Sequence, residues 1–335
     1  MGEGNLPPDL PSVREAAANN RPYVLETPVH AWRGIEVADR AGAQTEVVLK
    51  LELFQYSGSF KARGAITSIS ALDEAAREKG VTAVSAGNHA IATAYAASRL
   101  GASAKVVMLA SANPARVARA RAYGAEVLMS PTGAEAFELA RRIEAEEQRA
   151  FIHPFEGRPV AIGTATLGLE FSSQVGALDA VIIPIGGGGL CGGVSWAFKQ
   201  LQPGCKIYGV EPVGADTMHR SFAAGEPVSR SDIATIADSL APPYALPYSI
   251  SLCRQNVDEL VLVDDAQIMD AMAVLFREMK LAIEPAAAAA TAALFGPLRD
   301  KLAGKRVGII VCGANIDLDS FARYVGQGQA PSTRQ

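Results

Sequence analysis

The chain has 335 residues, of which 49% are hydrophobic and 20% charged, and its formal net charge is -4. This composition is typical of a globular enzyme, and the length is sufficient for two domains. The small negative charge argues against a nucleic-acid-binding protein, and no apolar run reaches the roughly 20 residues needed to span a bilayer. The polar start lacks a signal-peptide pattern, and the four cysteines form no Cys-x-x-Cys pair. We therefore expect a cytoplasmic protein in a reducing environment.

Apolar runs that predict strands alternate with helical patterns along almost the whole chain. We expect strands at residues 47–53, 81–85, 104–109, 126–129, 180–185, 206–210, 259–263 and 307–311. Helices are expected at residues 90–100, 114–123, 134–147 and 266–280, and the proline-rich residues 241–251 are expected to form an irregular loop. This alternation predicts an α/β fold of mostly parallel sheets covered by helices. Such sheets bind ligands beyond the carboxyl ends of their strands.

The segment Ser57–Gly64 has the sequence SGSFKARG and places Lys61 directly after a tight Gly-Ser turn. The apolar periodicity that follows predicts that Lys61 lies in the first turn of a helix. Because an ammonium group near apolar surface loses its proton more readily, Lys61 is a candidate for forming a Schiff base with an aldehyde. An ordinary surface lysine beside a turn is the alternative, and the octapeptide alone does not decide between them.

Residues 85–89 (SAGNH) follow a predicted strand and open a predicted helix. Their hydroxyl, amide and backbone donors suit a small carboxylate. The alternative is that Ser85 or Asn88 simply caps the helix.

Four consecutive glycines, Gly186–Gly189, also separate a predicted strand from a predicted helix. Their backbone N–H groups at a helix start would form a cradle for a phosphate. The same region satisfies the dinucleotide fingerprint Gly187-x-Gly189-x-x-Gly192, and Glu211 follows about 20 residues later, as a ribose-binding acid would. A dinucleotide-binding oxidoreductase is therefore an alternative.

Two later residues are ambiguous on their own. Cys312 ends an apolar strand, where cysteine is more often a small buried hydrophobic residue than a reactive one. Glu284 precedes Pro285 and an alanine run, which predicts the start of a tightly packed helix and a structural role for the glutamate.

Together these segments resemble the fold type II pyridoxal-phosphate enzymes, in particular the serine/threonine dehydratase (threonine ammonia-lyase) and serine racemase family. The matching segments occur in the family's order and are Ser57–Gly64, Ser85–His89, Gly186–Leu190, Gly209–Pro212, Ile236–Asp238, Glu284–Ala286 and Cys312–Asn315. The resemblance implies a tryptophan synthase β-like α/β fold with two domains. It implies a large cofactor-binding domain of residues 1–71 and 153–325 and a small domain of residues 72–152, and we expect residues 326–335 to form a disordered tail.

The resemblance also implies roles for single residues. Lys61 would carry pyridoxal 5'-phosphate as a Schiff base and move the Cα proton of the substrate. Phe60 would pack against the pyridine ring, Asn88 would bind its hydroxyl oxygen, and Cys312 would face its nitrogen. The phosphate would be held by Gly186, Gly187, Gly188 and Gly189, and the substrate carboxylate by Ser85, Gly87, Asn88 and His89.

The implied reaction is the conversion of a small β-hydroxy amino acid to a 2-oxo acid and ammonia. The Cα proton becomes acidic because the cofactor delocalises the electrons left behind, and the β-hydroxyl then leaves. We expect L-threonine or L-serine as the substrate, and a role for the enzyme in amino-acid catabolism. The family also leads us to expect a homodimer.

Several positions depart from the family's usual pattern. Ala86 stands where the racemases carry a second serine, so dehydration is favoured over racemisation, which remains an alternative. Thr217 replaces an aspartate of the family's metal-binding loop, although Glu211 and the carbonyl of Ala215 remain as candidate ligands for a divalent cation.

Three further departures concern the substrate. Ser239 replaces a common glycine, and Thr164 and Ala165 replace the usual Gln-Gly. These changes leave 3-hydroxyaspartate and 3-phenylserine open as alternative substrates.

Overall fold

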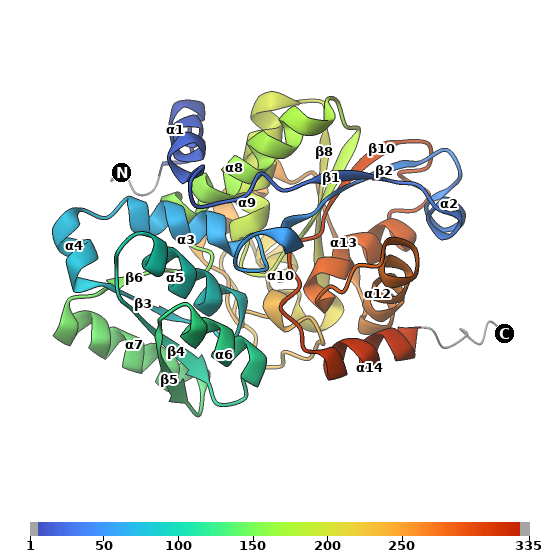
Figure 1. The fold of residues 1–335 in the computed structure, drawn as a ribbon. Helices are drawn as coiled ribbons and strands as arrows, with labels where there is room; N and C mark the ends of the chain where they lie inside the picture. Colours follow the sequence, from blue (N-terminus) through green and yellow to red (C-terminus); the bar gives the residue numbers. More distant parts are fainter. Residues whose placement is uncertain (1–5, 329–335) are drawn as a thin grey trace.

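The computed structural model describes residues 6–328 and contains two separate β-sheets (Figure 1). The larger sheet has the strand order β1-β2-β10-β7-β8-β9, and the smaller has the order β5-β4-β3-β6. Strand β1 is antiparallel to β2, whereas the other neighbouring strands within residues 6–328 are parallel. The strands are Val29–Trp32 (β1), Glu46–Lys50 (β2), Val81–Val84 (β3), Ala104–Leu109 (β4), Glu126–Ser130 (β5), Ala150–Phe151 (β6), Ala180–Pro184 (β7), Lys206–Pro212 (β8), Glu259–Val263 (β9) and Arg306–Ile310 (β10).

Helices cover both sheets, and most of them connect successive parallel strands, as such sheets require. The helices are Leu10–Asn20 (α1), Ile35–Ala41 (α2), Lys61–Ser70 (α3), Glu74–Lys79 (α4), Asn88–Arg99 (α5), Pro114–Ala122 (α6), Gly133–Glu147 (α7), Arg158–Val175 (α8), Gly189–Leu201 (α9), Thr217–Ala224 (α10), Pro247–Asn256 (α11), Asp265–Met279 (α12), Pro285–Phe295 (α13) and Leu318–Gly328 (α14).

The smaller sheet is covered on both faces. Val106 and Met108 of β4 share a buried cluster with Ile91 of α5, whereas Val107 packs in a different cluster with Ile143 of α7. Successive side chains of a strand point to opposite faces, so this alternation places α5 and α7 on opposite sides of the sheet. Because helices cover both faces of the sheet, β4 carries apolar side chains on both faces.

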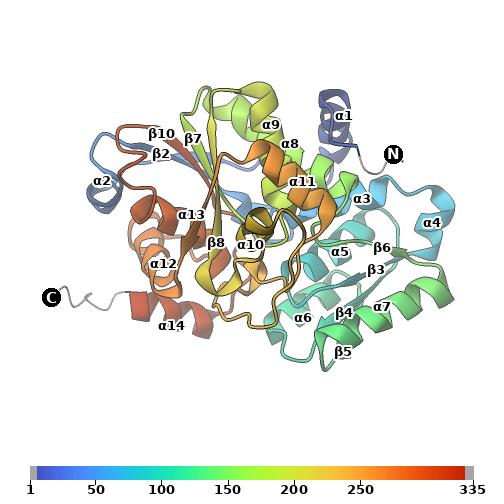
Figure 2. The same ribbon diagram turned by 180° about the vertical axis from the view of Figure 1, so that it is seen from behind.

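The larger sheet has α8 and α9 on one face and α12 and α13 on the other (Figures 1 and 2). On the first of these faces, Phe171 of α8 and Phe198 of α9 pack edge-to-face, with ring centroids 5.8 Å apart. Helix α13 is buried along its whole length, and its alanines allow it to lie close to the strands. The main core of the protein therefore surrounds this sheet.

The mostly parallel α/β architecture is confirmed, and the strands at residues 104–109 and 259–263 have the predicted bounds. Strand β2 ends at Lys50 rather than at residue 53, because Glu52–Phe54 form a 3-10 turn that leads toward Lys61. An apolar run cannot distinguish such a turn from a continuing strand. Strand β1 is not predicted by the sequence pattern, because half of its four residues are exposed.

Two predicted irregular segments are partly wrong. The loop expected at residues 241–251 ends at residue 246, because Pro247 opens α11, a position that suits proline's fixed φ and missing N–H. Of the tail expected at residues 326–335, residues 326–328 belong to α14, and the remainder lies outside the described residues. None of the helices in residues 6–328 is both long and apolar enough to cross a membrane.

Candidate active site

The predicted motifs meet where the smaller sheet adjoins the larger one. Asn88 opens α5 after β3, and Asn315 follows β10 of the larger sheet. The Asn315 amide nitrogen donates to Asn88 Oδ1 at 2.6 Å. The carboxyl ends of strands from both sheets therefore face one shared site.

Lys61 is the first residue of α3, as predicted, and the turn before it is fixed to the end of the larger sheet. Ser59 forms an isolated bridge with Gly313, and the backbone N–H of Phe60 donates to the Cys312 carbonyl at 3.0 Å. The Lys61 amine donates to the carbonyl of Pro154. Burial lowers the pKa of Lys61 to about 8, although Cys312 and Glu284 oppose the shift. The Lys61 amine thus loses its proton at a lower pH than an exposed lysine does.

Three ionisable neighbours of Lys61 are uncharged at neutral pH. Burial and then the charge of Lys61 lower the pKa of His89 to about 3, and the same causes lower the pKa of His153 to about 4. Burial, followed by the charge of Glu284, raises the pKa of the Cys312 thiol well above its usual value. His89 Nε2 donates to the carbonyl of Ile152 at 2.8 Å, so this ring nitrogen is already engaged.

The glycine loop forms a tight cradle at the N-terminus of α9. Gly188 has a φ of +92°, which favours glycine. A Cβ atom at Gly187 would lie 2.2 Å from the ring of Phe155, and one at Gly189 would lie 2.7 Å from the Phe155 carbonyl oxygen. Larger residues therefore do not fit here, and the backbone N–H groups remain available to an anion.

Glu284 takes part in the site, which the sequence alone did not indicate. Its carboxylate does not cap α13 but accepts from Asn88 Nδ2 at 2.6 Å and from the backbone N–H of Asn315 at 3.2 Å. Asn88 is thereby held on both sides, by Glu284 and by Asn315. Ser85 contributes locally, since its hydroxyl accepts from the backbone N–H of Gly87 at 3.1 Å.

Arg116 is a second residue that the sequence reasoning missed. It lies on α6, pairs with Asp238, and donates from Nε to the Asn315 carbonyl at 2.7 Å. Its Nη2 atom is 3.9 Å from Glu284. Helix periodicity gives the only local indication that this arginine is buried: Arg116 lies four residues before the buried Ala120, on the same side of α6. Arg116 therefore connects the smaller sheet to the larger one across the site.

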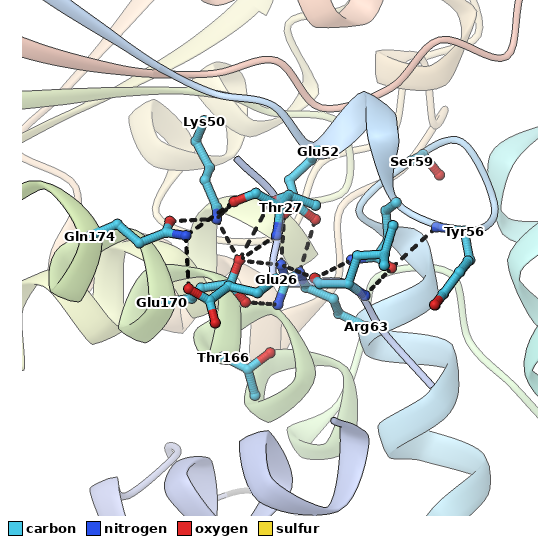
Figure 3. Close-up of polar contacts among 12 residues, drawn as sticks. Glu26, Thr27, Lys50, Glu52, Tyr56, Ser59, Arg63, Thr166, Glu170 and Gln174 are labelled. Carbon is cyan, nitrogen blue, oxygen red and sulfur yellow. Dashed lines mark hydrogen bonds and ion pairs between the residues drawn. The ribbon is translucent and has the colours of Figure 1, made fainter. Parts of the chain in front are cut away.

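A buried network of ion pairs, drawn in Figure 3, supports the helix that bears Lys61. Arg63 donates to both oxygens of Glu52 and to both oxygens of Glu170, at 2.8 to 2.9 Å. Lys50 donates to Glu170, to the Thr27 carbonyl and to Gln174. Burial raises the pKa of Glu170, but the charges of Arg63 and Lys50 outweigh it and lower the pKa. The network ties α3 to β2 and α8.

Aromatic side chains gather beside Lys61 and the glycine loop. Phe155 follows Pro154, and its ring lies 5.9 Å from that of Tyr244 and 4.7 Å from that of His153. Phe137 lies 5.9 Å from Tyr244 and 6.5 Å from Phe151. We call these five residues the aromatic cluster. It joins α7 and β6 of the smaller sheet to residues 241–246 beside the larger sheet.

Glu211 does not reach this site. Its carboxylate accepts from the backbone N–H groups of Met218 and His219, at 2.8 and 2.7 Å, near the start of α10. Burial raises the pKa of Glu211 to about 8, against the effect of these N–H groups. A free ribose-binding acid, as the dinucleotide alternative requires, is therefore not supported at this position.

Comparison with known proteins assigns this fold and site to one family. The family of pyridoxal-phosphate dependent enzymes matches residues 21–313. The chain is 54% identical to the phenylserine dehydratase of Ralstonia pickettii, over 96% of this chain and 97% of that protein. It is 37% identical to the L-threo-3-hydroxyaspartate ammonia-lyase of Saccharomyces cerevisiae, over 97% and 99%. The structure of maize serine racemase matches with a TM-score of 0.88 and 35% identity, covering 96% of this chain and 98% of that one.

The chain therefore belongs to the pyridoxal-phosphate dependent enzyme family and has the fold of its fold type II members. The fold class and the cofactor, pyridoxal 5'-phosphate, are as the sequence predicted. The residues in place fit that cofactor, because an amine with a lowered pKa, a neutral thiol and a glycine cradle adjoin one another.

Proposed function

We propose that the protein is an ammonia-lyase that converts a β-hydroxy amino acid to a 2-oxo acid and ammonia. The observation that carries this proposal is the convergence of Lys61, Asn88, Cys312 and the glycine loop from distant parts of the chain. The names of the relatives in Ralstonia and Saccharomyces support the same class of reaction.

The proposed cofactor contacts follow from this geometry. Lys61 would hold the cofactor aldehyde, and Phe60 would pack against its ring. Asn88, fixed by Glu284 and Asn315, would bind the ring hydroxyl oxygen, and the neutral thiol of Cys312 would lie against the ring nitrogen. The N–H groups of Gly186–Gly189 would bind the phosphate. When bound, the cofactor delocalises the electron pair left at Cα.

Lys61 is the proposed base. Its side chain would accept the Cα proton of the substrate, and its lowered pKa makes the uncharged amine easier to reach. The Cβ–O bond would then break, and the hydroxyl would leave as water with the proton that Lys61 took from Cα. Hydrolysis of the released enamine yields the 2-oxo acid and ammonia. His89 and His153 are neutral, so they do not add positive charge that would lower the basicity of Lys61 further.

The substrate carboxylate would bind at the start of α5, through the hydroxyl of Ser85 and the N–H groups of Gly87, Asn88 and His89. The backbone of His89, rather than its ring, would take part, because the ring is bonded to Ile152. Ala86 provides no acid or base on the other side of the substrate, so we propose that racemisation is slow compared with dehydration.

An aryl side chain on the substrate is favoured over a carboxylate. Phe155 of the aromatic cluster follows Pro154, whose carbonyl accepts from the Lys61 amine, so the cluster lies beside the proposed base and would pack against a phenyl ring. Arg116, a cation beside the site that could attract a second carboxylate, is already paired with Asp238, and Arg119 donates to the Asn315 side chain at 3.0 Å. We therefore propose a 3-phenylserine-type substrate ahead of 3-hydroxyaspartate, with L-threonine and L-serine as weaker substrates.

The test is 2-oxo acid release by the cofactor-loaded protein from 3-phenylserine, 3-hydroxyaspartate, L-threonine, L-serine and their D-forms. We expect the fastest release from 3-phenylserine. Lys61→Ala should lose both the visible absorption of the bound cofactor and turnover, whereas Lys79→Ala, a change in the C-terminal turn of α4, should retain both. No release from any member of the panel, with the cofactor bound, would contradict the proposed reaction.

We also propose the domain division of residues 1–71 with 153–325, and 72–152, which agrees with the separation of the two sheets. We propose a homodimer from the family resemblance. We propose a cytoplasmic location because the four cysteines are free thiols. Sedimentation velocity of the purified protein tests the oligomeric state.

A further inference from the structure

Residues 211–217, from the end of β8 to the first residue of α10, correspond to the metal-binding loop that the family resemblance implies. Thr217 stands in place of the third ligand, and its hydroxyl donates to the carbonyl of Pro242 at 3.3 Å. Both oxygens of Glu211 already accept backbone N–H groups. Across residues 6–328, His, Cys, Asp and Glu side chains form no group of three or more suited to holding a metal. The donor set therefore does not fit a divalent cation.

A positively charged side chain, that of Arg230, lies against this loop. The guanidinium of Arg230, only 8% exposed, donates to Asp216 and lies 3.4 Å from the carbonyl of Val213. Its Nε and Nη2 atoms donate to Asp232 at 3.0 and 2.8 Å. A planar guanidinium group can donate hydrogen bonds to several oxygen atoms at once, just as a metal ion binds several oxygen ligands.

Arg230 also connects the loop to a second segment, residues 228–246. The N–H of Arg230 donates to the carbonyl of Pro243 at 2.7 Å, and Ser229 forms a bridge with Tyr244. The two segments approach closely, since a Cβ atom at Gly214 would lie 1.7 Å from the carbonyl oxygen of Ala234. The second segment carries Tyr244 of the aromatic cluster and Asp238, the partner of Arg116.

We infer that the side chain of Arg230 serves as the fixed cation of the loop at residues 211–217, and that this loop binds no divalent cation. A divalent cation prefers several oxygen ligands at about 2.0 to 2.6 Å. Here Asp216 and Glu211 are engaged by arginine and by backbone donors, and the positive charge of Arg230 repels a second cation. The positive charge of Arg230 thus holds the loop at residues 211–217 against the segment 228–246, which carries Tyr244 and Asp238 beside the active site.

The first test is a thermal unfolding series on the cofactor-loaded protein in millimolar MgCl2, CaCl2 or EDTA at constant ionic strength. The expected result is the same Tm and the same cofactor circular dichroism in all three. A Tm that rises with Mg²⁺ or Ca²⁺ and falls with EDTA would overturn the inference. This measurement needs no variant, so it stands even if a substituted protein fails to fold.

The second test compares Arg230→Met with Arg220→Met. Arg220 also pairs with Asp216 but is half exposed, so it is the matched control. We expect Arg230→Met to lower the Tm by about 4 °C and to change the cofactor circular dichroism, with little effect from Arg220→Met. Arg230→Lys should restore part of the Tm because it keeps the charge. Equal effects of the two methionine substitutions would show that Arg230 is not the fixed cation.

Discussion

Arg63 and Glu170 form a two-pronged ion pair, with Nη1 to Oε2 and Nη2 to Oε1 both at 2.9 Å (Figure 3). Arg63 lies two residues after Lys61 on α3, and Glu170 lies on α8. The pair therefore fixes the orientation of the helix whose first residue is Lys61. Since Lys50 and Glu52 complete the network, its positive and negative charges are balanced.

Glu170→Gln should lower the free energy of unfolding by about 2 kcal/mol, because it leaves Arg63 and Lys50 with one charged partner fewer in a buried site. Urea unfolding of the apoprotein measures the change. Glu36→Gln is the matched control, because Glu36 also pairs with an arginine, Arg277, but both side chains are 35% exposed. Such a pair contributes about 0 to 1 kcal/mol. Equal losses in the two variants would contradict the structural role of the network.

The lowered pKa of Lys61 predicts a pH-dependent stability of the apoprotein. The folded state releases the Lys61 proton at about pH 8, whereas the unfolded chain holds it up to about 10.5. Between these values the unfolded state binds more protons, so the Lys61 contribution to stability rises with pH. Below pH 8 the full penalty of burying the ammonium is present.

Unfolding of the apoprotein and of its Lys61→Met variant at a series of pH values tests this sign. Lys61→Met should be more stable than the unsubstituted protein at pH 7, and the difference should shrink as the pH rises above 8. A difference that is constant from pH 7 to pH 10 would show that the Lys61 amine is not desolvated.

Arg116→Met should reduce kcat/KM by about tenfold or more, equivalent to about 1.4 kcal/mol. Arg116 holds Asp238 and the Asn315 carbonyl from the opposite sheet, and Asn315 in turn positions Asn88. Arg121→Met changes an exposed residue of the same helix and should leave kcat/KM within about twofold. Steady-state kinetics on one substrate compares them, and similar values for the two variants would refute the role of Arg116.

Tyr244→Ala should raise KM for 3-phenylserine by roughly fivefold, as expected from loss of an aromatic contact. The KM for L-threonine should change by less than about twofold, since its methyl group is too small to require the cluster. Tyr248→Ala removes a tyrosine outside the aromatic cluster and serves as the control. If both substrates respond equally to Tyr244→Ala, the cluster does not select an aryl group.

Features that depend on near neighbours in the chain were predictable. The Gly-Ser turn before Lys61, the glycines before α9 and the apolar alternation of helices and strands act through hydrogen bonds and sterics within a few residues. The positions of Lys61 and Asn88 at helix starts were confirmed for this reason. The roles of the site residues remain proposals.

The partners that complete the site were decided by tertiary structure. The sequence determined an α/β chain with a candidate Schiff-base lysine and a phosphate cradle. It did not indicate that Glu284 holds Asn88, that Arg116 pairs with Asp238, or that Arg230 lies beside the loop at residues 211–217. Glu284 and Asn88, like Arg116 and Asp238, lie more than 100 positions apart and meet only when the two sheets pack together. Their burial and pairing depend on that packing, which no local pattern of polar and apolar residues encodes.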